Sequence, residues 1–256
     1  MNVVVCVKQI PDPAVPGELD SDHTLKREGK LILDESDSYG VEMALQLVDK
    51  AGGGEVTLIS MAPNAEVSGL RTALAMGAAK AILVSDDALA GADALTTSKV
   101  LAKCVERAGE VDLVLTATES TDGYTGTIPA QVAELLGWPS LTFAKEVHLE
   151  GGTAKIQRQT EAGYDVVEAS LPAVVSVTAG VVEPRYPSFK GIMAAKSKPV
   201  DQVTTGDLGL SADAIAPNQT ITSVTAAPAR EAGEKIEDDG TAFEKVVEFL
   251  DGLKVI

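Results

Sequence analysis

The segment TESTDGYTGTIPA at 118–130 carries the residue types best suited to binding an anion. It follows an apolar run that ends at Thr116 and precedes a helical pattern that ends at Gly137. Glycine lets a ligand approach the backbone closely, and the free N–H groups at the start of a helix favour negative charge. Hydroxyl groups on Thr125 and Thr127 would add hydrogen-bond donors. The segment therefore predicts a pocket for a ligand that carries phosphate.

Two features of this segment weigh against that interpretation. An ordinary helix cap with a tight turn would also explain one or two small or hydroxylic residues. The acids Glu119 and Asp122 would repel a phosphate. The run of small residues is longer than a cap requires, however, and its length favours the phosphate pocket.

The sequence carries no signal for bond-breaking chemistry on such a ligand. It lacks both a G-x-x-x-x-G-K-[ST] loop and a G-x-G-x-x-G turn after the first apolar run. Cys6 falls within that run, where a buried thiol is usually inert. We find no nucleophile and base placed to act together, so no catalytic residue is assigned. The pattern indicates a site that holds a nucleotide without hydrolysing it.

A second segment, PRYPSFKGIMAAKSKPV at 184–200, reverses the sign of an otherwise acidic chain. It contains no acid, and its cations are Arg185, Lys190, Lys196 and Lys198. Tyr186 and Phe189 lie among them. Aromatic anchors among cations suit a protein-docking loop, in which the anchor is buried and the charges steer the partner. A solvated basic loop explains the composition equally well.

The elements that must position both segments alternate between apolar runs and helical patterns in the first half of the chain. We expect strands at 3–10, 55–61, 81–85 and 111–116. We expect helices at 38–50, 64–76 with Asn64 as its N-cap, 93–108 and 128–136. Strands without polar alternation, separated by helices, are typical of a doubly wound α/β fold with a mostly parallel sheet. Ligands of such sheets bind beyond the carboxyl ends of the strands, where 117–128 is expected.

The second half of the chain follows a different pattern. After Pro139 apolar residues alternate, and turn residues recur at 151–152 and 162–163, which predicts antiparallel hairpins added to the sheet. A buried strand is expected at 173–178. We expect a nucleotide-binding α/β domain at 1–200, then a C-terminal part at 201–256 with an extended arm and a helix at 241–253. That helix either folds back on the same core or packs on another subunit.

The net charge of −17 over 256 residues narrows the classes of function. Binding to nucleic acid or to an anionic membrane needs a basic surface, so neither is expected. No apolar run reaches the roughly 20 residues of a membrane-spanning helix, and the start MNVVVCVKQIPDP lacks a signal-peptide pattern. The two cysteines, Cys6 and Cys104, suit a reducing compartment. We therefore expect a cytoplasmic protein without membrane insertion.

Five motifs resemble those of the electron transfer flavoprotein beta subunit, also called the FixA-type subunit. They are, in chain order, VVCVKQIPD near the start, RTALAMGA at 71–78, STDGYTGTIPAQVAELLGWP at 120–139, LPAVVSV at 171–177 and EPRYPSFKGIMAAK at 183–196. The resemblance covers residues 1–200 in one register and the tail weakly.

The resemblance implies an electron carrier that is not itself an enzyme. In this family an alpha and a beta subunit form a heterodimer. The alpha subunit holds most of a redox-active FAD, and the beta subunit buries an AMP of structural role. The FAD accepts electrons from acyl-CoA dehydrogenases or other flavin dehydrogenases, as in fatty acid oxidation. It passes them to the respiratory chain through a quinone oxidoreductase.

The resemblance also implies site residues, carried over by position. The phosphate of AMP would rest on the backbone at 123–128. The residues implied to hold AMP are Cys6, Asp34, Asp37, Met61, Asp122, Gly123, Thr125, Gly126, Thr127 and Ile128. The segment 184–196 would be a recognition loop for partner dehydrogenases, with Phe189 as its apolar anchor. The residues implied to dock the partner are Arg185, Tyr186, Phe189 and Lys190. The C-terminal helix would pack on the alpha subunit.

Two other functions stay open. In the bifurcating variant of the family a second FAD replaces AMP and NADH is the donor, although EPRYPSFKGIM resembles the non-bifurcating group more. An ATP pyrophosphatase-like enzyme of related fold would carry an S-G-G-x-D-S type of loop after its first strand. Residues 8–13 offer nothing similar.

Overall fold

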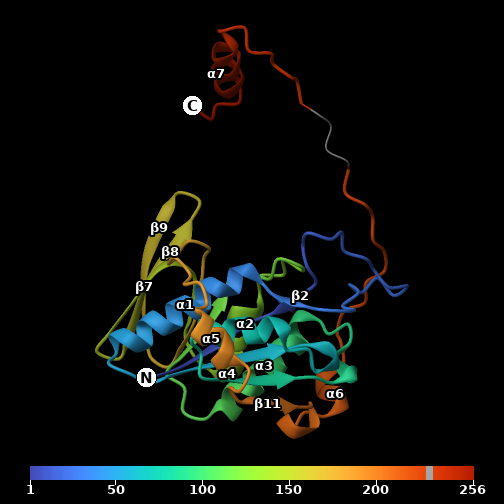
Figure 1. Ribbon diagram of the computed structural model, residues 1–256, viewed down its shortest axis with the longest axis vertical. Helices are drawn as coiled ribbons and strands as arrows, with labels where there is room; N and C mark the ends of the chain where they lie inside the picture. Colours follow the sequence, from blue (N-terminus) through green and yellow to red (C-terminus); the bar gives the residue numbers. More distant parts are fainter. Residues whose placement is uncertain (229–232) are drawn as a thin grey trace. The chain divides into compact units, whose positions relative to one another are not determined.

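The computed structural model describes residues 1–228 and 233–256. These divide into two compact units, Met1–Ile221 and Thr222–Ile256. The first unit is built around a large sheet (Figure 1). The second unit contains helix α7 (Ala242–Gly252).

The sheet of the first unit has nine strands in the order β11-β5-β4-β1-β6-β10-β7-β8-β9. All six strand pairs between β11 and β7 in this order are parallel. All residues of β6 and β10 are buried, as expected for apolar runs in a sheet covered on both faces. The strands are β1 (Asn2–Cys6), β4 (Glu55–Met61), β5 (Lys80–Val84), β6 (Leu113–Ala117), β7 (Ser140–Glu150), β8 (Thr153–Thr160), β9 (Gly163–Ser170), β10 (Ala173–Val177) and β11 (Val200–Val203). A separate antiparallel pair consists of β2 (Gln9–Ile10) and β3 (Ile32–Leu33).

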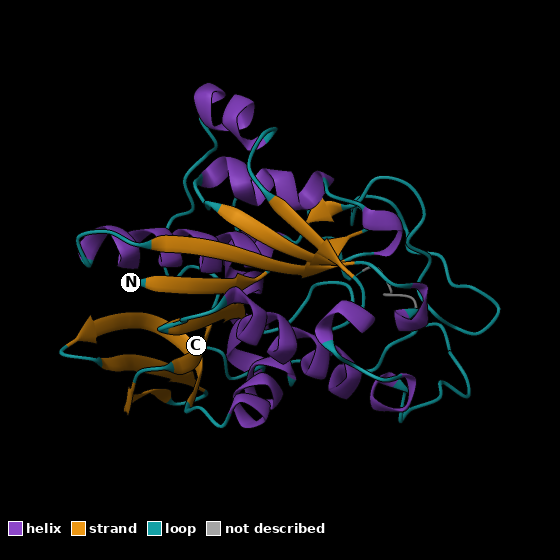
Figure 2. Ribbon diagram, turned by 90° about the horizontal axis from the view of Figure 1, so that it is seen from below, coloured by secondary structure: helices purple, strands orange, loops and turns teal. Residues whose placement is uncertain are grey.

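Helices cover both faces of this sheet (Figure 2). They are α1 (Glu35–Lys50), α2 (Ser68–Met76), α3 (Ala94–Ala108), α4 (Ile128–Leu136), α5 (Phe189–Ala195) and α6 (Ala212–Ile215), with short 3-10 helices η1 (Pro63–Ala65), η2 (Asp87–Leu89) and η3 (Gly206–Leu208). In β1, Val3 and Val5 join the apolar cluster that contains residues of α1 and α2. Val4 and Cys6 join the cluster formed with α3 and α4. This alternation between two cores confirms the predicted doubly wound α/β fold.

The strand order reverses at β1. From β1 the chain proceeds to β4 and then β5, after which α3 returns it to β6 on the other side of β1. The connections that follow β1 and β6 therefore diverge at one edge of the sheet. In open α/β sheets this reversal is where ligands bind, at the carboxyl ends of the strands.

The three strands β7, β8 and β9 form the antiparallel addition that the sequence predicts. β7 is parallel to β10 and antiparallel to β8, which in turn is antiparallel to β9. The β7–β8 turn is made by Gly151 and Gly152, with φ of 56° and 80°. Glycine suits these positive angles because it has no Cβ.

Three local predictions differ from the structure. The strand expected at 3–10 ends at Cys6, and Gln9–Ile10 pairs with β3 in a separate sheet. Asn64 is not the N-cap of a helix: it lies in η1 with φ of 53°, and α2 begins only at Ser68. The docking segment, expected as a loop, contains a helix, α5. Ser188 initiates α5 by accepting a hydrogen bond from Gly191 N at 3.0 Å.

The arm expected from residue 201 begins later in the structure. β11 pairs with β5 along its length, and η3 and α6 follow before the first unit ends at Ile221. Asp86 anchors this stretch by accepting hydrogen bonds from Thr205 N at 3.0 Å and from Thr205 Oγ1 at 2.5 Å. These elements have four residues or fewer, which is too short to show a hydrophobic period.

Helix α7 confirms the predicted C-terminal helix. None of its residues is buried within the part of the chain that the structure describes. Phe243, Val247 and Phe249 are all more than half exposed. Across the described ranges, no helix combines the length and the apolar character needed to cross a bilayer.

Candidate functional site

The candidate site lies at the edge of the sheet where the strand order reverses. Cys6 is the last residue of β1, Met61 is the last residue of β4, and 118–127 connects β6 to α4. Cys6, Met61 and Ile128 contribute to one apolar cluster with α3 and α4. Asp34 and Asp37 enter at the start of α1. The fold therefore brings the residues implied to hold AMP to one edge of the sheet.

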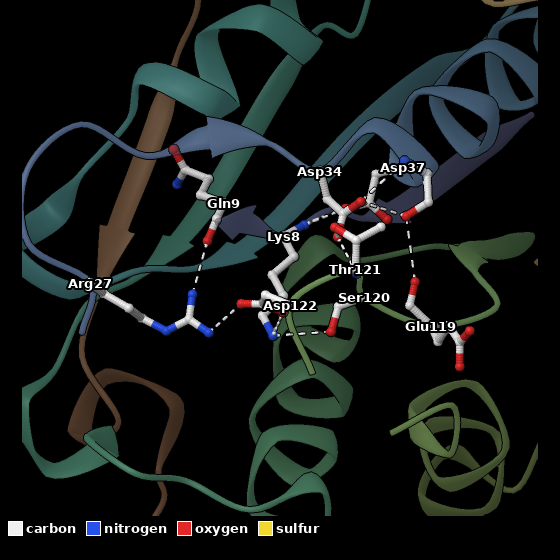
Figure 3. Close-up of polar contacts among 10 residues, drawn as sticks. Lys8, Gln9, Arg27, Asp34, Asp37, Glu119, Ser120, Thr121 and Asp122 are labelled. Atoms are coloured by element: carbon white, nitrogen blue, oxygen red, sulfur yellow. Dashed lines mark hydrogen bonds and ion pairs between the residues drawn. The ribbon is translucent and has the colours of Figure 1, made fainter. Parts of the chain in front are cut away.

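Asp122 is held by two cations (Figure 3). Its carboxylate pairs with Lys8 Nζ at 2.6 Å and with Nη2 of Arg27. Lys8 Nζ also donates to Ser120 Oγ at 3.2 Å. Burial favours a higher pKa for Asp122, but Lys8 and Arg27 outweigh it and hold the pKa below its usual value. One of the two acids that weighed against a phosphate is therefore neutralised within the protein.

Asp34 joins the start of α1 to the loop after β6. Its Oδ1 accepts hydrogen bonds from Ser36 N at 3.1 Å and Ser36 Oγ at 2.7 Å, which caps the helix. Its Oδ2 accepts from Thr121 N at 2.8 Å and Thr121 Oγ1 at 3.1 Å. The side chain is buried, so all four bonds form away from water. The carboxylate of Asp34 thus fixes the loop.

Asp37 and Cys6 are buried groups behind this loop. Asp37 Oδ2 accepts a hydrogen bond from Lys8 N at 2.6 Å. Burial raises the pKa of Asp37 well above its usual value, in spite of that hydrogen bond. Burial likewise raises the pKa of the Cys6 thiol, and the nearby Cys104 and Asp37 add to the effect. The thiol is therefore protonated and unreactive at neutral pH.

The start of α4 leaves backbone N–H groups available as hydrogen-bond donors. Thr127 precedes the helix, and its side chain forms no capping hydrogen bond within the described residues. Pro129 occupies the first turn, where the missing N–H would have no partner. A Cβ placed on Gly123 would lie 3.4 Å from Ser120 Oγ and 3.9 Å from Lys8 Nζ. A side chain at position 123 would therefore contact Ser120 and Lys8, and the Lys8 ammonium group, which is paired with Asp122, lies beside the loop.

Glu119 is a second acid near the start of this helix. A Cβ placed on Gly126 would lie 3.5 Å from Glu119 Oε2. Gly126 has φ of 68°, a conformation that favours glycine. The Glu119 carboxylate therefore lies beside the amides that an anion would use, and the two would compete for them.

Two concave pockets of the described surface lie elsewhere. One is lined by Asn2, Glu55 and Lys80 at the amino ends of the strands. The other is lined by residues that include Met1 and His148. Ligands of doubly wound sheets bind at the carboxyl ends of the strands. We therefore place the candidate site at the strand reversal, because of the strand order and because the start of α4 supplies hydrogen-bond donors there.

The docking segment presents its two aromatic rings to solvent. Tyr186 is 93% exposed and Phe189 is 81% exposed, and Lys190 is exposed beside them. Arg185 behaves differently, because its Nε and Nη2 donate to the Glu42 carboxylate of α1 at 2.6 Å and 3.0 Å. Arg185 is thus bound to the body of the protein, whereas the two rings and Lys190 are free to meet a partner.

Neither Lys8 nor Arg27 is among the predicted site residues, although the strand end 6–9, which contains Lys8, is also a candidate for which a simple loop is the preferred interpretation. Lys8 lies two residues after the end of β1, and its place at a carboxyl end is a usable signal for a site residue. Arg27 lies in a loop without periodicity, and its partner Asp122 is 95 residues away in sequence. No local pattern identifies such a pair.

Fold and site together define a doubly wound α/β protein with its candidate binding crevice at the strand reversal. A family model described as the electron transfer flavoprotein domain matches residues 22–208. Among curated proteins, the electron transfer flavoprotein subunit beta of Mycobacterium tuberculosis is 40% identical over 264 residues, covering 100% of this chain and 99% of the relative. The corresponding subunit of Mycobacterium leprae is 41% identical over 265 residues, with the same coverage.

A more distant relative is the caffeyl-CoA reductase-Etf complex subunit CarD of Acetobacterium woodii. It is 36% identical over 250 residues, covering 96% of this chain and 95% of the relative. The chain belongs to the electron transfer flavoprotein beta-subunit family, a family of electron carriers.

Proposed function

We propose that this chain is the beta subunit of a heterodimeric electron transfer flavoprotein and that it catalyses no reaction of its own. Its alpha subunit partner holds most of the FAD. When bound, the FAD accepts electrons from acyl-CoA or other flavin dehydrogenases and passes them to a quinone oxidoreductase of the respiratory chain. Family membership over the full chain supports this proposal. We propose the cytoplasm as its compartment.

AMP is the ligand we propose for the crevice. The observation that carries this step is the arrangement around 118–127: an α4 start without a side-chain cap in the described residues, and Lys8 Nζ 3.9 Å from a Cβ placed on Gly123 in the loop before that helix. Helix-start amides and an ammonium group fit a phosphate. Two acids of the site, Asp34 and Asp122, are already satisfied by protein donors, so they do not oppose the anion.

The adenine would need an apolar surface close to the phosphate subsite. Cys6, Met61 and Ile128 form part of one apolar cluster at the same edge of the sheet, and such surfaces accept planar rings. The roles of these residues are to bind and orient the nucleotide. A ligand that binds only the folded chain also stabilises it. The proposed AMP is therefore structural, and electron transfer belongs to the FAD.

Nucleotide analysis of the purified heterodimer tests this proposal. The chain is co-expressed with its alpha subunit, and the released nucleotides are quantified by mass spectrometry. We expect AMP and FAD in comparable amounts. Recovery of ATP, or of no nucleotide other than FAD, would contradict the assignment of the crevice to AMP.

A second candidate is that the crevice holds a second FAD. The likeness to a subunit of a caffeyl-CoA reductase-Etf complex favours it, because that relative works in an assembly with a reductase. Two FAD molecules per heterodimer without AMP would establish this alternative in the same experiment.

We propose two interaction surfaces as well. Tyr186, Phe189 and Lys190 dock the electron-donating dehydrogenase, supported by the exposure of both rings on a segment without acids. The apolar side chains of α7 pack on the alpha subunit, supported by their exposure on an amphipathic helix. An amphipathic helix of this length gains most of its stability from packing.

A further inference from the structure

Hydrogen bonds from two cations hold helix α5, which begins at Phe189, against α2. One cation lies on α2 and the other lies just after α5. Arg71 of α2 donates from Nη1 to Ala195 O at 2.6 Å and to Lys198 O at 2.8 Å. Lys198 donates from Nζ to Leu74 O at 2.8 Å and to Ala78 O at 2.6 Å. Each segment therefore supplies a cation to carbonyl oxygens at the end of the other's helix.

Two of these carbonyl groups, Ala195 O and Leu74 O, lie at helix ends, and Leu74 O also accepts a hydrogen bond from Gly77 N at 3.2 Å. Ala195 ends α5, and Leu74 lies in the last turn of α2. A cation at a helix C-terminus satisfies such oxygens and interacts favourably with the helix dipole. Lys198 is partly withdrawn from water, which lowers its pKa, so its ammonium group depends on these carbonyl oxygens as partners. The hydrogen bonds of Arg71 and Lys198 thus stabilise the C-terminal ends of both α5 and α2.

The backbones of α5 and α2 also touch directly. A Cβ placed on Gly191 would lie 2.4 Å from Ala75 O, well inside the contact distance of real atoms. Only glycine permits this approach, since any other residue would push the two helices apart. The backbones of α5 and α2 are therefore in close contact at Gly191.

A third contact, an ion pair, holds the segment just before Tyr186. Arg185 donates to both carboxylate oxygens of Glu42, from Nη2 to Oε1 at 3.0 Å and from Nε to Oε2 at 2.6 Å. Glu42 is buried on α1, where it also accepts a hydrogen bond from Gln46 Nε2 at 2.8 Å. A bidentate pair of this kind fixes orientation as well as distance. The segment is thus anchored to α1 before Tyr186 and to α2 after Phe189.

The residues between these anchors are the ones that the solvent reaches. Tyr186 and Phe189 are the most exposed, and Ile192 and Met193 are about half exposed. Phe189, Ile192 and Met193 lie three and four positions apart, so they share one face of α5. Two of the four cations of the segment, Arg185 and Lys198, are engaged inside the chain, which leaves Lys190 and Lys196 exposed on its surface.

We propose that Arg71, Lys198 and the Glu42–Arg185 pair are positioning residues that preorganise the docking surface. They contact no partner themselves. They hold the apolar face of α5 in its docked position before the encounter, so less conformational freedom is lost on binding. The inference rests on the proposed docking function and goes beyond it, because it assigns partner affinity to residues outside the contact surface.

The test uses the intact heterodimer and a purified flavin dehydrogenase at saturating substrate. Electron uptake is measured against heterodimer concentration for wild type, Phe189→Ala, Arg71→Ala and Arg71→Lys. We expect Arg71→Ala to raise KM about tenfold with kcat and flavin content unchanged. Arg71→Lys keeps a positively charged donor group on a shorter, less rigid side chain and restores part of the affinity. Hydrogen exchange of the amides at 189–198 should quicken in Arg71→Ala and stay at the wild-type rate in Phe189→Ala.

The outcomes separate this inference from the docking proposal. If Phe189→Ala raises KM while Arg71→Ala leaves both KM and amide exchange at wild-type values, docking stands and the positioning role is wrong. If Phe189→Ala changes nothing, the docking proposal itself fails. Should Arg71→Ala not fold, Glu42→Gln provides the second variant, since it weakens the Arg185 pair with little change of shape. An unchanged KM in Glu42→Gln would then overturn the inference.

Discussion

At the scale of single residues, the candidate site is shaped by the different environments of three aspartates. Asp34 is satisfied by four protein hydrogen bonds, and Asp122 is neutralised by Lys8 and Arg27. Asp37 is buried, and its pKa is raised. Carboxylates whose charge is satisfied or suppressed within the protein leave the α4 start available to an anion.

The pKa of Asp37 gives a pH-dependent prediction. Its folded pKa lies above the usual 3.8, so its contribution to stability is full below 3.8 and is lost as the pH rises through the folded pKa. Asp37→Asn removes this loss and retains an oxygen acceptor for Lys8 N. We therefore expect its free energy of unfolding to rise relative to wild type by about 1.4 kcal/mol per pH unit across that window. Chemical denaturation between pH 4 and pH 8, on the order of five pH values, measures it.

Asp122→Asn is the matched variant, because it should respond with the opposite sign. The folded pKa of Asp122 is lowered, so its contribution is present above 3.8 and disappears as the pH falls through the folded pKa. The variant should be less stable than wild type by about 1–2 kcal/mol at neutral pH and equal to it in acid. If the stability difference from wild type changed with pH in the same direction for both variants, the environments assigned to Asp37 and Asp122 would be wrong.

Glu119 gives a prediction about nucleotide affinity. Its carboxylate lies near the α4 start, where it would compete with a phosphate. Glu119→Gln should tighten AMP binding about two- to fivefold, because one charge near a helix terminus is worth ~0.3–1 kcal/mol. Equilibrium binding to nucleotide-depleted heterodimer measures the change. Glu110→Gln, at the amino end of the sheet, is the control and should leave affinity unaltered.

At the scale of elements, the packing of α5 against α2 depends on Gly191, where the two backbones approach closely. Gly191→Ala would place a methyl group 2.4 Å from Ala75 O, and relief requires α5 to move. We expect a loss of about 1–3 kcal/mol in stability, as is typical of overpacking, together with weaker dehydrogenase docking. Thermal unfolding and the KM for the heterodimer measure the two effects.

Gly206→Ala is the matched control for this substitution. A Cβ there would meet Thr204 Oγ1 at 3.6 Å, an ordinary contact, so stability should change little. Equal losses in Gly191→Ala and Gly206→Ala would mean that the close approach of α5 to α2 is not what limits substitution at 191.

At the scale of the whole molecule, the two units differ in their cores. The first unit has a complete apolar core, and the helix of the second unit has no buried residue among those described. The unit Met1–Ile221 buries two apolar clusters, one on each face of the sheet. The unit Thr222–Ile256 holds α7, none of whose residues is buried in the described part of the chain. A helix of this kind needs a surface to pack on, and the alpha subunit is the surface we propose.

The double substitution Phe243→Asp with Phe249→Asp tests the role of α7. Both rings are about two-thirds exposed, so their loss should leave the unfolding temperature of the isolated beta chain unchanged. We expect association with the alpha subunit to weaken at least tenfold, since aromatic anchors dominate most interfaces. Titration calorimetry with the alpha chain measures the affinity. A drop in the unfolding temperature of the isolated chain would show instead that α7 folds back on its own core.

The sequence by itself determined the elements whose signals are local. The apolar runs of β1, β4, β5 and β6 and the glycine stops after α2 and α4 are properties of neighbouring residues, so periodicity and capping rules find them. The doubly wound sheet and its hairpins follow from the order of these signals. The same local rules placed 118–127 at a strand end, because its glycines and hydroxyls adjoin the start of a helix.

Tertiary structure alone decided which side chains meet across long separations. Lys8 meets Asp122 over 114 residues, and Arg71 meets Ala195 over 124. It also decided that β11, η3 and α6 belong to the first unit, since elements this short gain their stability from the surface they pack on. Such pairings depend on how the strands are ordered in space, and the energy that selects them is shared among many residues. No short stretch of sequence therefore records them.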